Sequence, residues 1–508
     1  MFKKLFKPID LTKGTIWKSI ILFSVPILLS YLFQQIYTIA DASICGQFLN
    51  ANQVAGVNNT GNITFIVLQF AFGCTAGFSV ISSSLIGRGD EEGVKKSFAV
   101  QIKLSFIISI VLTILSCLMI NPLLKLIGLT KSDNPVQNEI YHSAYTYVLI
   151  IFLGTFAQIF YNLICSFLRS VGDSVTPLIF LIISAILNIV LDLIFIAIFK
   201  WGVAGAAIAT VIAQMISAIG CFIYTFKKYP KFRLNINYFK SDFKFTMNHL
   251  KLGLPLAFQF SILAIGLIVM QAVIVKFDTS IDGVVITNYA QNGFGAATKL
   301  NNFLMCPFSA VGTAMLSFCG QNDGAGEKCR IKKGVKEALL IVFCEFIIFG
   351  GIGMLLTING AYLHIFYSED KINEMTIFYG NRYLYCDLSL YYFLGILFVF
   401  RNSLQGIGKA IYPLLAGIGE LVARTVICLV LPNIINGGAI NIEASRASVF
   451  GLAFADPLAW IFAVVIMSVG VIKYIFKDDK KAFIYQKWYI KLLNRYSFID
   501  WLLLIIQL

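Results

Sequence analysis

The chain has 508 residues, of which 58% are hydrophobic and 13% are charged. A soluble domain has roughly 45–50% apolar and about 25% charged residues, so this composition excludes a soluble globular protein, a disordered chain and a disulfide scaffold. The net charge of +14 lies in short loops between apolar stretches. We therefore expect the charge to indicate how the chain is oriented in the membrane, and we expect no nucleic-acid partner.

Apolar stretches recur along the whole chain. A spanning helix needs about 20 mostly apolar residues, and the polar breaks predict about twelve spans, which begin near residues 16, 61, 98, 142, 177, 203, 253, 289, 335, 382, 411 and 449. The first span follows a basic segment, Met1 to Lys18. We interpret it as a retained helix, because its apolar part is too long for a signal peptide and lacks a small-residue cleavage site.

The first span carries an isolated acid, Asp41, in a long segment without other charges. Gln34, Thr38 and Asp41 recur at helical spacing and therefore share one face, and Pro26 removes a backbone donor and should kink the helix. A charge at the bilayer centre costs about 2.5–3.5 kcal/mol, so Asp41 indicates an ion pathway. The alternative is that Asp41 merely ends the span at the outer surface.

The fifth and sixth spans add a second polar group. Asn188 and Asp192 are four residues apart, as are Thr210 and Gln214 in the next span. Three helices can therefore point oxygen atoms into one pocket with Asp41. Desolvated carboxylates can take up a proton, and carboxylate, amide and hydroxyl oxygens suit a hard cation such as Na⁺. The alternative is a satisfied polar cluster that holds helices together.

The second half of the chain repeats the first. Residues 168–177 recur as 404–413 with matching Leu, Gly and Pro, and three further matches follow in the same order. Repeats with an even number of spans keep their orientation, so the cleft between the halves is the expected substrate site. We predict an N-lobe (1–226), a cytoplasmic linker (227–252), a C-lobe (253–476) and a cytoplasmic amphipathic tail (477–508).

Other charges fall inside the later spans. Glu420 and Arg424 are four residues apart and are expected to pair with each other in a structural role. Glu345, Asp387 and Asp456 are each lone acids, near span ends or without a polar companion at helical spacing. We rank them below the cluster in the N-lobe.

The basic residues lie mainly on one side of the predicted spans, in the loops around Arg88, Arg169, Lys227–Lys251 and Lys328–Lys336 and at both chain ends. By the positive-inside rule this side is cytoplasmic. We therefore expect a multi-pass plasma-membrane protein with both termini in the cytoplasm. The preference for Ile, Lys and Asn over Arg suggests a bacterial source.

Motifs for other classes are missing from the sequence. It has no CxxC, HExxH or GxxxxGK[ST], its three histidines lie far apart, and its cysteines are scattered through apolar runs. We expect no enzyme, no cofactor and no metal other than Na⁺ as a coupling ion.

These motifs resemble those of the multidrug and toxic compound extrusion (MATE) family over almost the whole chain. The matching stretches are Ala40-Asp41 with Gly46, residues 168–177, 188–192, 202–210 and 320–326, and residues 405–408 with Glu420 and Arg424. The predicted fold is an all-α membrane protein with twelve transmembrane helices in two pseudo-symmetric six-helix lobes around a central cleft.

The resemblance implies an antiporter that exports organic cations or other drugs against an inward flow of H⁺ or Na⁺. The family's cation site resembles Asp41, Asn188, Asp192 and Thr210, and in one proposed mechanism the kink at Pro26 responds to protonation. Some members place an acid soon after the proline that starts the seventh span, where this chain has Gln259. This difference favours a cation site in the N-lobe. The residues expected to line the substrate cleft are Gln34, Tyr37, Gln214 and Gln259.

We therefore predict a monomeric, cation-coupled antiporter that exports organic cations, drugs or other small toxic compounds across the plasma membrane by alternating access. The nearest alternative is a flippase for lipid-linked precursors with the same two-lobe architecture. A flippase should line the cleft with several cations for a pyrophosphate group. Only Lys299 and Arg424 lie within spans, which favours cationic or neutral cargo.

Overall fold

The computed structural model describes residues 8–240, 242–367 and 372–477. Within these ranges the chain forms α-helices with short π- and 3-10 segments, and the one extended pairing is a bridge between Thr279 and Val285. Among the described residues, ten helices are long and apolar enough to cross a membrane, and two bent helix pairs bring the number to 12 when each pair counts as one span. The predicted all-α membrane fold is confirmed. The predicted tail lies almost wholly outside the described residues.

The first half of the chain forms one lobe. Its elements are α2 (Ile16–Phe48), α3 (Ala51–Asn59), α4 (Gly61–Arg88), α5 (Glu91–Leu118), α6 (Ile120–Leu126), α7 (Pro135–Leu153), α8 (Thr155–Ser170), α9 (Val175–Asp192), the π-helix η1 (Leu193–Ile198) and α10 (Gly202–Lys228). Two 3-10 turns, η2 (Pro230–Phe232) and η3 (Ile236–Phe239), connect it to the second lobe.

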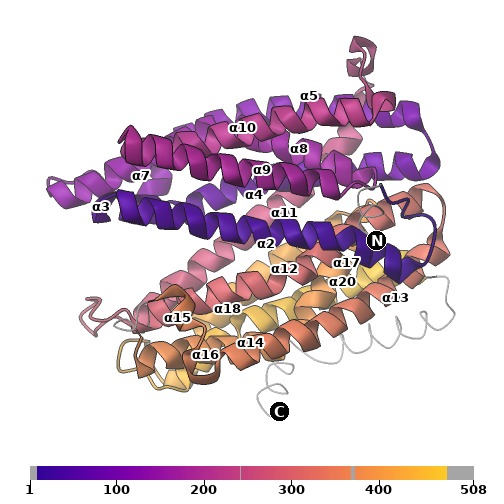
Figure 1. Ribbon diagram of the computed structural model, residues 1–508. Helices are drawn as coiled ribbons and strands as arrows, with labels where there is room; N and C mark the ends of the chain where they lie inside the picture. Colours follow the sequence, from indigo (N-terminus) through magenta and orange to yellow (C-terminus); the bar gives the residue numbers. More distant parts are fainter. Residues whose placement is uncertain (1–7, 241, 368–371, 478–508) are drawn as a thin grey trace.

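The second half forms the other lobe. Its elements are α11 (Phe243–Lys276), α12 (Tyr289–Gly324), α13 (Lys328–Glu345), the π-helix η4 (Phe346–Gly350), α14 (Gly351–Leu356), η5 (Ile358–Gly360), α15 (Leu363–Phe366), α16 (Glu374–Ser389), α17 (Tyr391–Gly406), α18 (Ile411–Asn436), α19 (Ser448–Ala453) and α20 (Ala455–Tyr474). Figure 1 shows this lobe beside the first one, with α2 lying along the boundary between them.

Helix ends follow local sequence signals. Gly89 ends α4 in a left-handed conformation (φ 73°), which a residue without Cβ adopts without strain. Asp90 then caps α5, because its side chain accepts a hydrogen bond from the backbone N–H of Gly93 at 2.8 Å. Asn134 caps α7 in the same way, with Pro135 in the first turn of the helix.

The two lobes share one irregularity that supports the duplication. In the first lobe, α7 and α8 meet at an angle of 46°, and in the second, α16 and α17 meet at 54°. Each pair is the fourth span of its lobe when a bent pair is counted as one span. The duplicated motif 168–177 and 404–413 begins at the end of each pair.

We call the two ends of the helical bundle the inner end and the outer end. The inner end contains residues 89–90, 171–174 and 325–327, and the outer end contains residues 49–50 and 277–288. The loops expected to be cytoplasmic all lie at the inner end. Figure 1 shows the described start of the chain at this end, where the lobes meet, and shows the lobes diverging towards the outer end.

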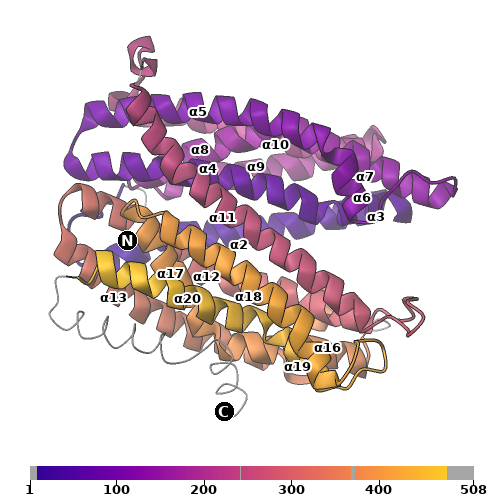
Figure 2. The same cartoon turned by 180° about the vertical axis from the view of Figure 1, so that it is seen from behind.

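The lobes contact each other through α4, which packs against α11 and α12, and through α2, which packs against α12 and α13. Figure 2 shows α11 between α4 of the first lobe and α18 of the second. Glycine allows the close approach at the inner end and near the middle of α4: a Cβ atom at Gly87 would overlap the carbonyl oxygen of Gln321, and one at Gly77 would lie 2.5 Å from the Cα of Gly253. The lobes therefore touch backbone to backbone on this side.

Burial along α2 shows where the lobes separate. Its inner half is packed, and the residues Phe23, Ser24, Pro26, Ile27 and Ser30 are buried. Beyond Tyr31, whose hydroxyl lies 2.9 Å from that of Thr313 on α12, the next buried residue of α2 is Cys45. On the α2 side the interface is therefore packed at the inner end and separates towards the outer end, whereas α4 and α11 stay in contact further out, where the Ser261 hydroxyl donates to the Ile66 carbonyl at 3.2 Å.

The segment before α2 joins both lobes at the inner end. The N–H of Ile9 donates to the carbonyl of Gly172 in the first lobe at 2.9 Å. Leu11 is fully buried, and its carbonyl accepts hydrogen bonds from Asn322 and Arg330 of the second lobe. The Arg330 guanidinium also donates to the carbonyls of Lys13 and Gly14, both at 2.8 Å. This segment ties the lobes together by main-chain contacts.

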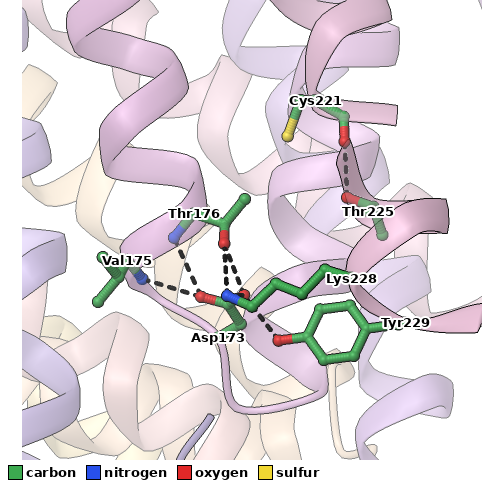
Figure 3. Close-up of polar contacts among 7 residues, drawn as sticks. All are labelled: Asp173, Val175, Thr176, Cys221, Thr225, Lys228 and Tyr229. Atoms are coloured by element: carbon green, nitrogen blue, oxygen red, sulfur yellow. Dashed lines mark hydrogen bonds and ion pairs between the residues drawn. The ribbon is translucent and has the colours of Figure 1, made fainter. Parts of the chain in front are cut away.

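The turn between α8 and α9 is fixed by the buried carboxylate of Asp173 (Figure 3). It accepts hydrogen bonds from the N–H groups of Val175 and Thr176 and from the Thr176 hydroxyl, and so caps α9. At the end of α10, Lys228 and the Tyr229 hydroxyl bond the same carboxylate at 2.8 and 2.7 Å. The inner ends of α9 and α10 are thereby held together.

Candidate functional site

Two carboxyl groups meet inside the first lobe. Asp41 lies in the outer half of α2 and Asp192 is the last residue of α9, and their side chains lie against each other. Asp192 is fully buried and Asp41 is partly buried. One oxygen of each, Oδ1, is buried without a hydrogen-bond partner among the described residues. The predicted pairing of α2 with α9 is therefore present in the structure.

Asn188 and Thr210 complete the group. Asn188 lies one turn before Asp192 on α9, and its amide lies between Asp192 and Thr210 of α10. With its nitrogen towards Asp192, the amide donates to Oδ2 at 2.8 Å, while its oxygen lies 3.3 Å from the Thr210 hydroxyl. The structure brings together all four residues predicted to bind a cation.

Two aromatic residues cover this group. Tyr37 lies on α2, one turn before Asp41, and its hydroxyl lies beside Thr210. Tyr147 of α7 lies close enough to both acids to interact with them electrostatically. Sequence reasoning missed Tyr147, because nothing in the apolar pattern of α7 shows which side of that helix faces the acids. Cys45, one turn after Asp41, is buried and also lies close enough to both acids to interact with them electrostatically.

The charge of the site is not balanced by protein cations. Where side chains are described, the ion pairs all lie elsewhere, and none includes Asp41 or Asp192. Two adjacent carboxylates repel each other and lose hydration when they are buried. A proton or a small hard cation relieves both costs, and the oxygens of Asn188 and Thr210 are suitable additional ligands.

The backbone changes directly after the acid pair. The π-helix η1 begins at Leu193, immediately after Asp192, and α10 follows it after a turn. π-Helical segments often lie at functional sites, because they interrupt the regular i→i−4 ladder and turn side chains out of register. The widened segment thus belongs to the same corner of the lobe as the carboxyl pair.

The remaining predicted site residues lie in three different surroundings. Gln34 is exposed on the half of α2 that faces the opening between the lobes. The Oε1 atom of Gln214 is buried without a described partner, one turn from Thr210 towards the inner end. Pro26 is buried in the inner half of α2, roughly 22 Å along the helix from Asp41, and does not contact the acid pair.

Gln259 does not line the cleft in this conformation, contrary to the sequence-based expectation. It is fully buried inside the second lobe, where its Oε1 accepts a hydrogen bond from Gln405 at 2.7 Å. This face of α11 packs against α18, and Gly417 leaves room for the side chain. The apolar pattern predicted the span correctly but not the direction in which Gln259 points.

The second lobe holds a buried network of charges. The predicted pair of Glu420 and Arg424 is confirmed at 3.0 Å, and Arg401 donates to the other Glu420 oxygen at 2.8 Å. Asp456 is not a lone acid, because Arg424 donates to it at 2.6 Å and the Tyr383 hydroxyl at 2.9 Å. These arginines compensate the two acids, which indicates a structural role.

Three acids of the second lobe, Glu337, Glu345 and Asp387, retain a buried oxygen without a partner among the described residues. Asp387 is fully buried and accepts one hydrogen bond, from Asn301 at 2.9 Å, while its Oδ1 has no partner in the described ranges. Glu345 ends α13 just before the π-helix η4, and its Oε2 likewise lacks a described partner. Asp387 lies near the carboxyl group of Asp456, but Arg424 pairs with Asp456 at 2.6 Å, so this group of acids has a cation beside it, in contrast to Asp41 and Asp192.

Comparisons with known proteins give a consistent result. The sequence pattern of the MatE family matches residues 26–194 and 259–430. The chain is 28% identical over 404 residues to the "Probable multidrug resistance protein YpnP" of Bacillus subtilis, and the matched region covers 79% of this chain and 85% of that protein. It is 23% identical over 401 residues to the "Multidrug export protein MepA" of Staphylococcus aureus (strain COL), covering 78% of this chain and 83% of the relative.

Other similarities concern a different cargo and the fold. The chain is 25% identical over 441 residues to the "FAD transporter" of Shewanella oneidensis, covering 84% of this chain and 90% of that protein. A solved structure described as "Crystal structure of MATE in complex with MaL6" superposes with a TM-score of 0.77 at 20% identity, over 92% of this chain and 98% of the other. This likeness supports the two-lobe fold.

Proposed function

Because this chain belongs to the MatE family, we propose that it is a cation-coupled antiporter that exports drugs or other small toxic compounds by alternating access. Family membership makes it a multidrug efflux transporter and not an enzyme. The coupling ion, the cargo and the direction of exchange are the subject of the proposal.

The observation that carries the proposal is the unbalanced acid pair of Asp41 and Asp192. Its carboxyl oxygens lie in a lobe interior that supplies no ion-pair partner among the described residues. Protons or Na⁺ entering from the outer end would neutralise the pair. Asn188 and Thr210 supply further oxygen atoms for Na⁺, whereas a proton needs only the carboxyl oxygens.

Exchange follows from linkage. If the coupling ion and the cargo favour opposite arrangements of the lobes, binding of one promotes release of the other. The membrane potential adds about 2.3 kcal/mol per charge per 100 mV, which is enough for roughly a fortyfold gradient. On the α2 side the lobes separate towards the outer end, and in the proposed cycle this is the arrangement in which ions enter and cargo leaves.

The orientation rests on the basic loops. We place the inner end in the cytoplasm, together with both chain termini, in the plasma membrane of a bacterium. The relatives reported above are bacterial. The flippase alternative is not favoured, because YpnP and MepA are named as multidrug proteins and the described spans place no cluster of cations between the lobes.

The test uses everted membrane vesicles and measures the accumulation of two fluorescent dyes, one an organic cation and the other a zwitterion with a carboxylate. Imposed Na⁺ and pH gradients, applied separately, should show which ion drives uptake. Asp41→Asn and Asp192→Asn should each lower ion-driven uptake at least tenfold, because an amide neither takes up a proton nor offers Na⁺ a full negative charge. Asp133→Asn, in an exposed outer loop, is the matched control and should transport normally.

Correct folding of each variant is checked by a monodisperse elution profile in detergent. Normal gradient-driven transport by both well-folded pair variants would contradict the assignment of the ion site. Equal transport with and without either gradient would contradict antiport itself.

A further inference from the structure

Lys299 lies in the outer half of α12, the helix between the two lobes. α12 packs against α13, α16 and α17 of its own lobe and against α2 and α4 of the other. Asn301, two residues later, points into the second lobe, where it bonds Asp387. Since each helical residue is rotated by about 100° from the last, Lys299 faces the opposite direction, and its side chain is exposed.

The contact between Tyr31 and Thr313 fixes the height of Lys299. α2 runs outward from Tyr31, so Asp41 lies about 15 Å farther out along α2. α12 runs inward, so Lys299, which precedes Thr313 in the chain, lies about 21 Å farther out than Thr313 along α12. Lys299 and Thr313 are also about four turns apart along α12, with Pro307 between them. The exposure of Lys299, opposite the buried Asn301, agrees with a position on the side of α12 that carries Thr313. Lys299 therefore lies across the opening from the acid pair, slightly nearer the outer end.

The ammonium group has no acidic partner where the side chains are described. Its recorded contact is with the ring of Phe366, whose centroid lies 5.6 Å from Nζ. Asn302, also exposed, follows on the same side of α12. A cation within a span is costly unless it is used, and intramembrane charges mark pathways by default. The structure leaves this charge open to a ligand from the cleft.

We propose that Lys299 binds a carboxylate of the cargo, so that the preferred cargo is a zwitterion or an organic anion and not a purely cationic compound. This inference rests on the proposed function, because it assumes that cargo enters the opening between the lobes. It differs from the expectation of cationic or neutral cargo, which counted the cations within spans but did not consider where they point.

The geometry explains how such a cargo would be selected. The ammonium can donate up to three hydrogen bonds, and charge-assisted bonds to a carboxylate are stronger than neutral ones. The opposite wall carries polar groups, including the exposed Gln34 and Thr38 of α2. A cargo without an acidic group leaves Lys299 unpaired, which disfavours it relative to one that has the group.

The test compares two dyes that differ in one group, rhodamine B, which has a free carboxylate, and its ethyl ester, which is a cation. Binding to the purified full-length protein is measured by fluorescence anisotropy, without any ion gradient. The wild type should bind the acid more tightly than the ester. Lys299→Gln should weaken binding of the acid about tenfold and leave the ester unchanged or improved, and Lys299→Arg should keep the preference for the acid.

Lys131→Gln, in an exposed loop at the outer end, is the matched control and should behave as wild type. Equal or tighter binding of the ester by the wild type would overturn the proposal, as would failure to bind the acid or an equal loss for both dyes in Lys299→Gln. Because this assay needs no coupling, its outcome is independent of the test with Asp41→Asn. Failure of the antiport proposal is therefore distinguishable from failure of this one.

Discussion

Asp173 shows how one residue sets both a local structure and a pH dependence. Burial would raise the pKa of its carboxyl group, but the hydrogen bonds and charge of Lys228 and the hydrogen bonds of Thr176 outweigh burial. The pKa therefore lies below the ordinary value of 3.8. Conversely, burial and this carboxylate raise the pKa of the Tyr229 hydroxyl, which stays protonated and remains a donor.

Asp173→Asn should lower the free energy of unfolding by about 1–3 kcal/mol, because a buried charged acceptor is lost and Lys228 is left unpaired. A depressed pKa stabilises the folded protein at pH values above 3.8, and this contribution is lost as the pH falls through the folded-state pKa. Thermal unfolding in detergent between pH 3 and 7 measures both effects.

In that experiment the melting temperature of Asp173→Asn should depend less on pH below 4 than that of the wild type. Thr225→Val, which removes a hydroxyl bonded within α10 to the Cys221 carbonyl, is a nearby control that keeps the acid response. An unchanged acid response in Asp173→Asn would show that other carboxyl groups dominate it.

At the scale of elements, the chain segment before α2 closes the inner end. It is held between Gly172 of one lobe and Arg330 of the other. Gln321 adds a direct link, because its amide donates to the carbonyl of Ser170 at 2.8 Å and its oxygen accepts from the N–H of Leu11. For the inner end to open, these contacts must break together.

Arg330→Gln should shift the equilibrium between the two lobe arrangements towards the one that is open at the inner end. Three charged-donor hydrogen bonds at a partly exposed site are worth on the order of 1–3 kcal/mol, or about 5–150-fold in the equilibrium. Spin labels at the exposed positions 96 and 333 report the separation of the lobes by electron–electron double resonance.

Arg233→Gln is the matched control, since this exposed arginine of the inner end bonds a single carbonyl, that of Phe226. It should leave the distance distribution unchanged. Identical distributions in Arg330→Gln and wild type would show that the segment does not hold the lobes together.

At the scale of the whole molecule, orientation in the membrane follows from charge. The exposed Cys329 lies between Lys328 and Arg330 at the inner end. If that end is cytoplasmic, a membrane-impermeant maleimide cannot reach Cys329 from outside the cell.

A variant with Cys329 as its one cysteine should be labelled only after the cells are permeabilised. A cysteine placed at position 133, in the exposed outer loop, should be labelled in intact cells and serves as the control. Labelling of Cys329 in intact cells at the same rate would reverse the orientation.

Much of this architecture could be predicted from the sequence, because only helices satisfy their backbone groups in lipid and their apolar lengths are distinctive. The cluster of Asp41, Asn188, Asp192 and Thr210 was predictable from isolated acids and spacings of four residues. The rotation of each helix about its axis was not, because both lipid and protein interior are apolar. The pairing of Asp456 with Arg424 and the burial of Gln259 depend on that rotation.

The hydrogen bonds between Arg330 and the segment before α2 have a practical consequence. Arg330 holds three carbonyl oxygens, those of Leu11, Lys13 and Gly14, so it recognises the path of the chain and not the identity of its side chains. The exposed Lys13 can therefore be replaced without loss of these hydrogen bonds, whereas Leu11 is fully buried and Gly14 has a φ of 75°, so these two positions are constrained. An affinity tag fused close to residue 9 would disturb these hydrogen bonds, whereas point changes at Lys13 would not.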